Sequence, residues 1–176
     1  MAGHNKWSKI KRQKGASDAQ KSKTFTKLVR YITVEAKKSA GNLASPGLAA
    51  AIKKAKESNM PNDTIDRAVK KATTDNSASM ENITYEAYGP GGCALVIETL
   101  TDNRNKAAQE IKHILSKNGF ALAAMGAATW AFKKEHQEWI PETTTPLSPE
   151  DSTKLEELMN ELEENDEVQE VYTNAE

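Results

Sequence analysis

The chain has 176 residues, of which 38% are hydrophobic, and a formal net charge of −1. This length fits one domain or two small ones, and the hydrophobic content supports only a modest core. The single cysteine, Cys93, excludes an internal disulfide framework and a zinc site built from several thiolates. No apolar run approaches the roughly 20 residues needed to cross a bilayer, and the N-terminus lacks the apolar core of a secretory signal. We therefore expect no membrane partner and a cytoplasmic location.

The charge is divided unevenly along the chain. Residues 1–79 contain 17 Lys and Arg but only 6 Asp and Glu, whereas residues 80–176 contain 7 Lys and Arg and 19 Asp and Glu. Such asymmetry favours two functional parts, one of them suited to nucleic acid. We expect a basic first domain over residues 1–76 and an acidic second domain over residues 77–176, joined by the polar, turn-rich stretch 73–79.

The basic residues are densest in the first forty positions, which hold 11 Lys and Arg against 2 acidic residues. Residues 3–15 have no amphipathic period and predict an extended arm that orders on binding. Trp7 within the arm has two interpretations, an anchor that pins the arm to the domain, which we prefer, or a ring that stacks on a base. The candidate nucleic-acid contacts of the arm are Lys6, Trp7, Lys9, Lys11, Arg12 and Lys14.

A helix is predicted from Ser17 or Asp18 to about Ser39. Its apolar residues fall on one side, and its cations fall on the other side with only Val34 among them. A solvated lysine face is the plain interpretation, but the absence of interleaved Glu four residues away favours a phosphate-binding face. The candidate contacts on this helix are Lys21, Lys23, Lys27, Arg30, Lys37 and Lys38.

Two shorter amphipathic helices follow, and they complete a predicted three-helix bundle. Ser45 and Pro46 predict the start of the first, and Pro61 the start of the second. Lys53, Lys54, Lys70 and Lys71 lie outside the apolar stripes of these helices, and we add them to the candidate nucleic-acid contacts.

After residue 79 the hydrophobic period changes to two, which is typical of strands. The expected elements, in chain order, are a strand over 83–88, a turn at 89–92, a central strand over 93–100, a helix capped by Asp102, a strand over 129–132, an edge strand over 139–145, a helix from Ser148 and a strand over 168–172. From Cys93 onward the order is β-α-β-β-α-β, the split or ferredoxin-like plan. The predicted fold class is α+β, with the helical bundle followed by this ferredoxin-like domain.

No constellation predicts catalysis. His4, His113 and His136 are too scattered for a triad or a metal site, and we expect no catalytic residue, metal or cofactor. The helix opening at Asp102, Asn103, Arg104 and Asn105 has two interpretations that stay open, a contact with a partner or helix capping with surface polarity.

Six strings in the chain resemble the YebC family of probable transcriptional regulators. They are MAGHNKWSKIK (1–11), KTFTKL (23–28), NMPNDTIDRA (59–68), YGPGG (88–92), LTDNRN (100–105) and VQEVYTNA (168–175). The resemblance covers nearly the whole chain. It departs from the family in one place, because typical members carry a further α/β domain where residues 133–138 form a short bridge here.

The resemblance implies a cytosolic, non-enzymatic protein with a polyanionic partner. Bacterial members are described as DNA-binding transcriptional regulators. The mitochondrial branch is described as a translational activator of cytochrome c oxidase, and a ribosome-associated role has been argued for bacterial members. Three hypotheses result: a regulator that binds duplex DNA, a translation factor that binds ribosomal RNA on the ribosome, and a module whose basic face binds acidic protein. A helix that reads bases is not predicted, so binding should be weakly sequence-specific.

Overall fold

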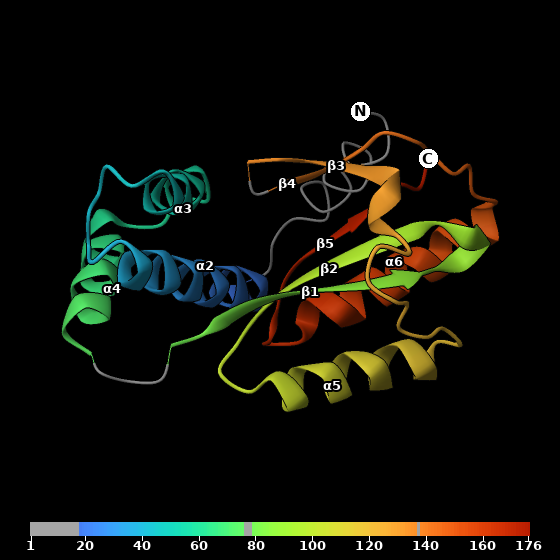
Figure 1. Ribbon diagram of the computed structural model, residues 1–176, viewed down its shortest axis with the longest axis horizontal. Helices are drawn as coiled ribbons and strands as arrows, with labels where there is room; N and C mark the ends of the chain where they lie inside the picture. The colour runs from blue at the N-terminus through green and yellow to red at the C-terminus, as the bar shows by residue number, and fades with distance from the viewer. Residues whose placement is uncertain (1–17, 76–78, 137) are drawn as a thin grey trace. The chain divides into compact units, whose positions relative to one another are not determined.

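The computed structural model describes residues 18–75, 79–136 and 138–176. The chain divides into two compact units, and the boundary between them in the sequence lies between Met80 and Glu81 (Figure 1). The boundary expected at residues 76 and 77 falls outside the described residues. Each unit has its own hydrophobic core, and each is described separately below.

The first unit consists of three helices, α2 (Asp18–Lys38), α3 (Pro46–Glu57) and α4 (Asn62–Thr74). The apolar stripes predicted from the sequence meet in one core, whose fully or nearly buried members include Leu28, Ile32 and Leu48. Burying a leucine or isoleucine side chain contributes about 1.5–3 kcal/mol, so this stripe is what holds the three helices together. The predicted helical bundle is therefore confirmed.

The loops of this unit follow the turn chemistry of the sequence, with one exception. Gly41 ends α2 with φ +78° and its amide donates to the carbonyl of Ala36 at 2.8 Å, the contact expected for a glycine after a helix C-terminus. Ser45 occupies the N-cap position of α3 as predicted, but its side chain makes no capping hydrogen bond. The start of α3 is therefore favoured by Pro46 at the first helical position, because the proline ring fixes φ close to its helical value.

The second unit is built on a three-stranded antiparallel sheet in the order β1-β2-β5. The strands are β1 (Glu81–Tyr88), β2 (Ala94–Thr101) and β5 (Val168–Thr173). All eight residues of β2 are buried, because the strand is central and both faces of the sheet are covered. The predicted central strand is thus confirmed, and the turn before it is the short helix η1 (Pro90–Gly92).

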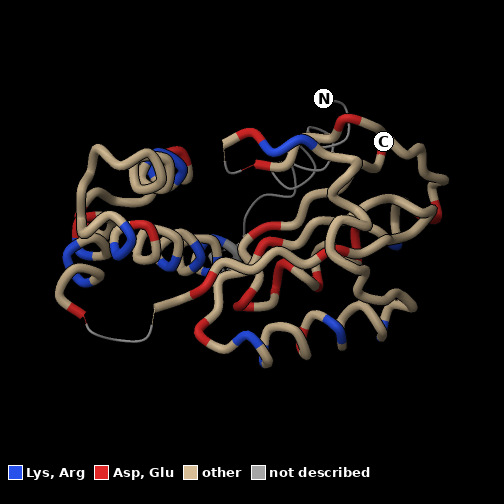
Figure 2. The backbone as a smooth tube through the Cα atoms, in the orientation of Figure 1, with Lys and Arg blue, Asp and Glu red and all other residues tan. Residues whose placement is uncertain are grey.

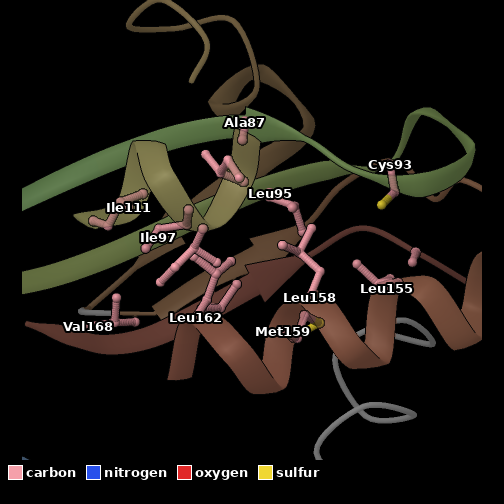
Figure 3. Close-up of a cluster of buried hydrophobic side chains, with 14 residues drawn as sticks. Ala87, Cys93, Leu95, Ile97, Ile111, Leu155, Leu158, Met159, Leu162 and Val168 are labelled. Atoms are coloured by element: carbon pink, nitrogen blue, oxygen red, sulfur yellow. The ribbon is translucent and has the colours of Figure 1, made fainter. Parts of the chain in front are cut away.

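One face of the sheet packs against two helices, α5 (Arg104–Lys117) and α6 (Pro149–Glu164). Figure 3 shows Leu95 and Ile97 of β2 directed toward Ile111 of α5 and toward Leu158 and Leu162 of α6. Cys93 lies at the same interface, where burial raises the pKa of its thiol and keeps it neutral.

The opposite face is covered by the short helix η2 (Thr129–Ala131) and by a hairpin of β3 (Phe132–Glu135) and β4 (Glu138–Pro141). A second cluster joins this layer to the sheet, with Val96 of β2, Ala131 of η2 and Phe132 of β3 all buried. The unit therefore has three layers, helices, sheet and hairpin (Figure 1).

The α+β class and the chain order β-α-β-β-α-β from β2 onward are confirmed, but three predicted details were wrong. The split plan places the two middle strands in the main sheet, whereas β3 and β4 pair only with each other and β1 occupies the edge of β2. The strand expected at 129–132 begins only at Phe132, because residues 129–131 form η2. The strand expected at 139–145 ends at Pro141, which cannot donate a ladder hydrogen bond.

Candidate nucleic-acid interface

The basic side chains of α2 occupy different environments along the helix. Those near its start are open to solvent, and those in its middle are half-buried. Lys21, Lys23 and Lys38 are exposed, whereas Lys27, Arg30 and Lys37 are intermediate.

The cationic face of α2 is less open than the sequence predicted. Val34, which interrupts the face, is only 4% exposed, and its neighbour Glu35 is 9% exposed. Glu35 accepts a hydrogen bond from Lys38 across 3.0 Å, so one candidate cation is paired within its own helix. In the first two turns of α2, the exposed candidate cations are Lys21 and Lys23.

The candidate lysines of α3 and α4 lie toward the C-terminal ends of the two helices, where the helix dipole favours cations. Lys53, Lys70 and Lys71 are exposed and Lys54 is half-buried. Lys53 lies 4.0 Å from Glu57, a surface pair that is worth little in water.

Taken together, residues 18–75 carry 12 Lys and Arg against 6 Asp and Glu. Figure 2 shows these cations distributed along α2, α3 and α4. Among the side chains that the structure describes, no ion pair joins Lys21, Lys70 or Lys71 to a carboxylate.

The candidate contacts of the arm lie outside the described residues and stay a prediction. They are Lys6, Trp7, Lys9, Lys11, Arg12 and Lys14.

The polar opening of α5 makes contacts within its own unit. The N-cap is Asn103, whose side-chain oxygen accepts from the amide of Lys106 at 3.0 Å, so the prediction that Asp102 caps this helix was wrong. Arg104 donates to Glu81 at 2.7 Å, and this hydrogen bond and the charge of Glu81 raise the pKa of Arg104. Asp102 and Asn105 are exposed. The observed contacts connect α5 to β1, and they agree with the capping interpretation of this segment.

Sequence reasoning missed a pair of exposed aromatic side chains on the second unit. Trp130 of η2 is 61% exposed and Tyr88 at the end of β1 is 38% exposed. The indole nitrogen of Trp130 donates to the hydroxyl of Tyr88 at 2.9 Å, and that hydroxyl donates to the carbonyl of Ala127. The signal in the sequence was the absence of any charged residue from 118 to 132, with a tryptophan inside that stretch.

The loop that carries Trp130 is fixed by a buried carboxylate. Glu86 of β1 is 5% exposed, and its two oxygens accept hydrogen bonds from the amides of Gly126, Ala128 and Thr129 at 2.7, 2.7 and 2.8 Å. Burial alone would raise the pKa of Glu86, but these amides lower it below its ordinary value. Glu86 is therefore ionised at neutral pH and holds the loop in place.

The described residues offer no other obvious site. Among them, no group of three or more His, Cys, Asp and Glu is arranged to hold a metal ion. Within the same residues, no helix is both long and apolar enough to cross a membrane.

Family models match both units of the chain. The model of the TACO1/YebC protein N-terminal domain matches residues 5–75. The model of the TACO1/YebC second and third domain matches residues 80–137 and 133–175, two segments that meet at the β3–β4 hairpin.

Curated bacterial relatives are similar over much or all of the chain. A protein of Fervidobacterium nodosum is 52% identical over 137 residues, which are 77% of this chain and 54% of that protein. A protein of Thermoanaerobacter pseudethanolicus is 36% identical over 239 positions, covering 100% of this chain and 97% of its own length. Both are named probable transcriptional regulatory proteins. Since this chain has 176 residues, 63 positions of the second alignment have no counterpart here.

A solved structure agrees with the fold. The crystal structure of a conserved hypothetical protein from Aquifex aeolicus superposes with a TM-score of 0.78 at 28% identity, covering 90% of this chain and 91% of that chain. With family models matched on both units and relatives aligned along the full length, the chain belongs to the TACO1/YebC family.

Proposed function

We propose that this protein is a non-enzymatic, nucleic-acid-binding regulator of gene expression, and that its basic helical unit contacts the phosphate backbone. The observation that carries the proposal is the twofold excess of Lys and Arg over Asp and Glu in residues 18–75, on a unit with its own hydrophobic core. Phosphate contacts by such cations supply affinity without sequence information.

Two targets are compatible with this chemistry. The names of the relatives favour duplex DNA and transcription, so a DNA-binding transcriptional regulatory protein is our first candidate. Ribosomal RNA on the ribosome is the second. It is favoured because no helix-turn-helix reader is predicted from the sequence, and RNA that is recognised by shape and phosphate needs no base-reading helix. Either role places the protein in the cytoplasm and requires no cofactor.

Binding experiments on matched charge variants test the basic surface. The double variant Lys21→Ala, Lys23→Ala removes two exposed cations from the helical unit. The control, Lys112→Ala with Lys154→Ala, removes two exposed cations from the acidic unit. The first variant should bind a 20-base-pair DNA duplex more weakly at every sequence and lower the salt slope by about two, roughly one for each lost contact. Equal effects of the two double variants would overturn the placement of the interface.

A paired measurement separates the two targets. Co-sedimentation with ribosomes at moderate salt is compared with a gel shift on duplex DNA, using the same protein preparation. Binding to ribosomes without a shift of DNA rejects transcriptional control by direct DNA binding. A shift of one promoter fragment but not of shuffled DNA supports it, and indifference to both rejects the nucleic-acid proposal as a whole.

A further inference from the structure

The exposed pair of Tyr88 and Trp130 has no role in the core of its unit. Trp130 is 61% exposed, while Ala131 directly after it and Ala128 two residues before it are fully buried. The backbone is thus anchored on the sheet and the indole ring is turned outward. Leaving so large an apolar side chain in water forgoes the burial energy that a core tryptophan would gain.

The two rings are held in a fixed arrangement. Their polar atoms are used internally, because the indole nitrogen donates to the hydroxyl of Tyr88 and that hydroxyl donates to Ala127. The loop beneath them is tied to Glu86 by three amides, and the amide of Ala123 donates to the carbonyl of Glu86 at 2.8 Å. What the pair offers to a partner is therefore the carbon surface of preorganised aromatic rings, without a hydrogen-bonding group of its own to satisfy.

The stretch that carries Trp130 has few charges, even though the unit as a whole is acidic. No charged residue occurs from 118 to 132, and the two lysines that flank this stretch, Lys117 and Lys133, are paired with Glu161 and Glu135. The exposed Glu142 lies beside η2, because its amide donates to the carbonyl of Ala131 at 2.8 Å. The carboxylate of Glu86 is buried and hydrogen-bonded by amides. The acidic helix α6 packs on the other face of the sheet from η2, so the sheet separates its glutamates from the rings (Figure 1).

We propose that Tyr88 and Trp130 form a stacking platform for an unpaired nucleobase, so that the target of this protein includes a single-stranded or looped segment rather than continuous duplex alone. The inference rests on the proposed nucleic-acid function and specifies its substrate class. Aromatic side chains stack on bases whose faces are free, and bases inside a duplex have no free face. In this scheme the basic helical unit supplies phosphate affinity and the aromatic pair supplies the preference for unpaired bases.

The test compares two probes with the full-length chain. One is a fluorescein-labelled 12-nucleotide single-stranded RNA, and the other is the same sequence annealed to its complement. Trp130→Ala should weaken binding of the single strand roughly tenfold, the order expected for one lost base stack, and change duplex binding less than twofold. Trp130→Phe, which retains a ring at the same position, should restore most of the affinity. Leu43→Ala removes another side chain that is 61% exposed, from the helical unit, and serves as the control.

The outcomes are distinct. If wild-type protein binds both probes and Trp130→Ala binds them equally well, the platform is refuted and the basic surface stands. If Trp130→Ala binds RNA normally but co-sediments less with ribosomes, the pair is a protein contact and the proposal is overturned. If neither probe binds the wild-type chain, both the platform and the proposed function fail. Circular dichroism of each variant establishes that the loss does not come from unfolding.

Discussion

The indole nitrogen of Trp139 donates a hydrogen bond to the carboxylate of Glu98 across 2.6 Å, which joins the β3–β4 hairpin to the central strand. The same carboxylate oxygen accepts from the hydroxyl of Thr84 on β1 at 2.9 Å. Lys134 lies 3.9 Å from that oxygen and 4.8 Å from the centre of the Trp139 ring. The Glu98 side chain is 11% exposed, so these donors compensate a nearly buried charge.

Replacing Trp139 by Phe should therefore destabilise the protein. The substitution keeps a ring in the cluster but removes a donor to a carboxylate, and we expect a loss of about 1.5–3 kcal/mol in the free energy of unfolding. Urea denaturation measures this loss. Trp130→Phe is the matched control, because its indole donates to a neutral hydroxyl at an exposed site and should cost clearly less. Equal losses for the two variants would show that the hydrogen bond from Trp139 to Glu98 stabilises the fold no more than the exposed hydrogen bond of Trp130.

The stability of the Trp130 loop should depend on pH through Glu86. The amide hydrogen bonds keep the pKa of Glu86 below its ordinary value of 4.5, so the ionised form stabilises the fold at neutral pH. This contribution should disappear as the pH falls below 4.5 through the folded-state pKa, since the protonated acid no longer accepts the three amides as strongly.

The expected result for Glu86→Gln is lower stability at pH 7 and a weaker dependence on pH in the acid range. Urea denaturation at pH 7 and at pH 3 measures both. Glu142→Gln, at an exposed position, is the control and should follow the wild-type profile. A Glu86→Gln profile parallel to that of the wild type would contradict the assignment.

The N-cap of α5 can be tested with two neighbouring substitutions. Asn103→Ala removes the side-chain oxygen that accepts from the amide of Lys106, and we expect a loss of about 1 kcal/mol. Asp102→Ala removes an exposed carboxylate that does not cap the helix, and the expected change is within about 0.5 kcal/mol. Thermal unfolding of the two variants measures the difference. A larger loss of stability for Asp102→Ala than for Asn103→Ala would show that Asp102 caps the helix.

The turn between β1 and β2 offers a second matched pair. Gly91 and Gly92 both have positive φ, +66° and +77°, so alanine at either position should cost about 1–2 kcal/mol. A Cβ on Gly91 would also lie 2.5 Å from Cδ2 of Leu147, whereas a Cβ on Gly92 would meet no atom within 4 Å. Gly91→Ala should therefore lower the midpoint of urea denaturation more than Gly92→Ala. Equal midpoints would mean that Leu147 moves aside without cost.

Much of the fold could be predicted because its hydrophobic patterns are local. The 3.6-residue stripe through Leu28 and Ile32 and the unbroken apolar run of β2 each specify one element and its buried side. The pairing of β3 with β4 alone could not be predicted in this way. It depends on β1 and β5 flanking β2 and on the hairpin packing across the face of the sheet, which are contacts between segments far apart in the sequence.

The candidate site was predicted less completely than the fold. The cations of α2 are visible as composition, and the pair between Glu35 and Lys38 follows from their i,i+3 spacing on one helix. The burial of Val34, in contrast, depends on three-dimensional contacts. Tyr88 and Trp130 are 42 residues apart in the chain, and their meeting depends on the loop that Glu86 holds. A sequence pattern cannot distinguish a tryptophan that fills a core from one that is turned toward solvent.

The tip of the β3–β4 hairpin is a position where a further domain can be inserted into the chain. Glu135 and Glu138 are register partners, so the chain leaves and re-enters the unit one strand spacing apart, about 4.8 Å. A domain whose N- and C-termini are separated by a similar distance can be inserted between Glu135 and Glu138 without changing the backbone of β3 or β4. The two segments that match the model of the second and third domain, residues 80–137 and 133–175, meet at this hairpin, so an insertion here would leave both matches unchanged.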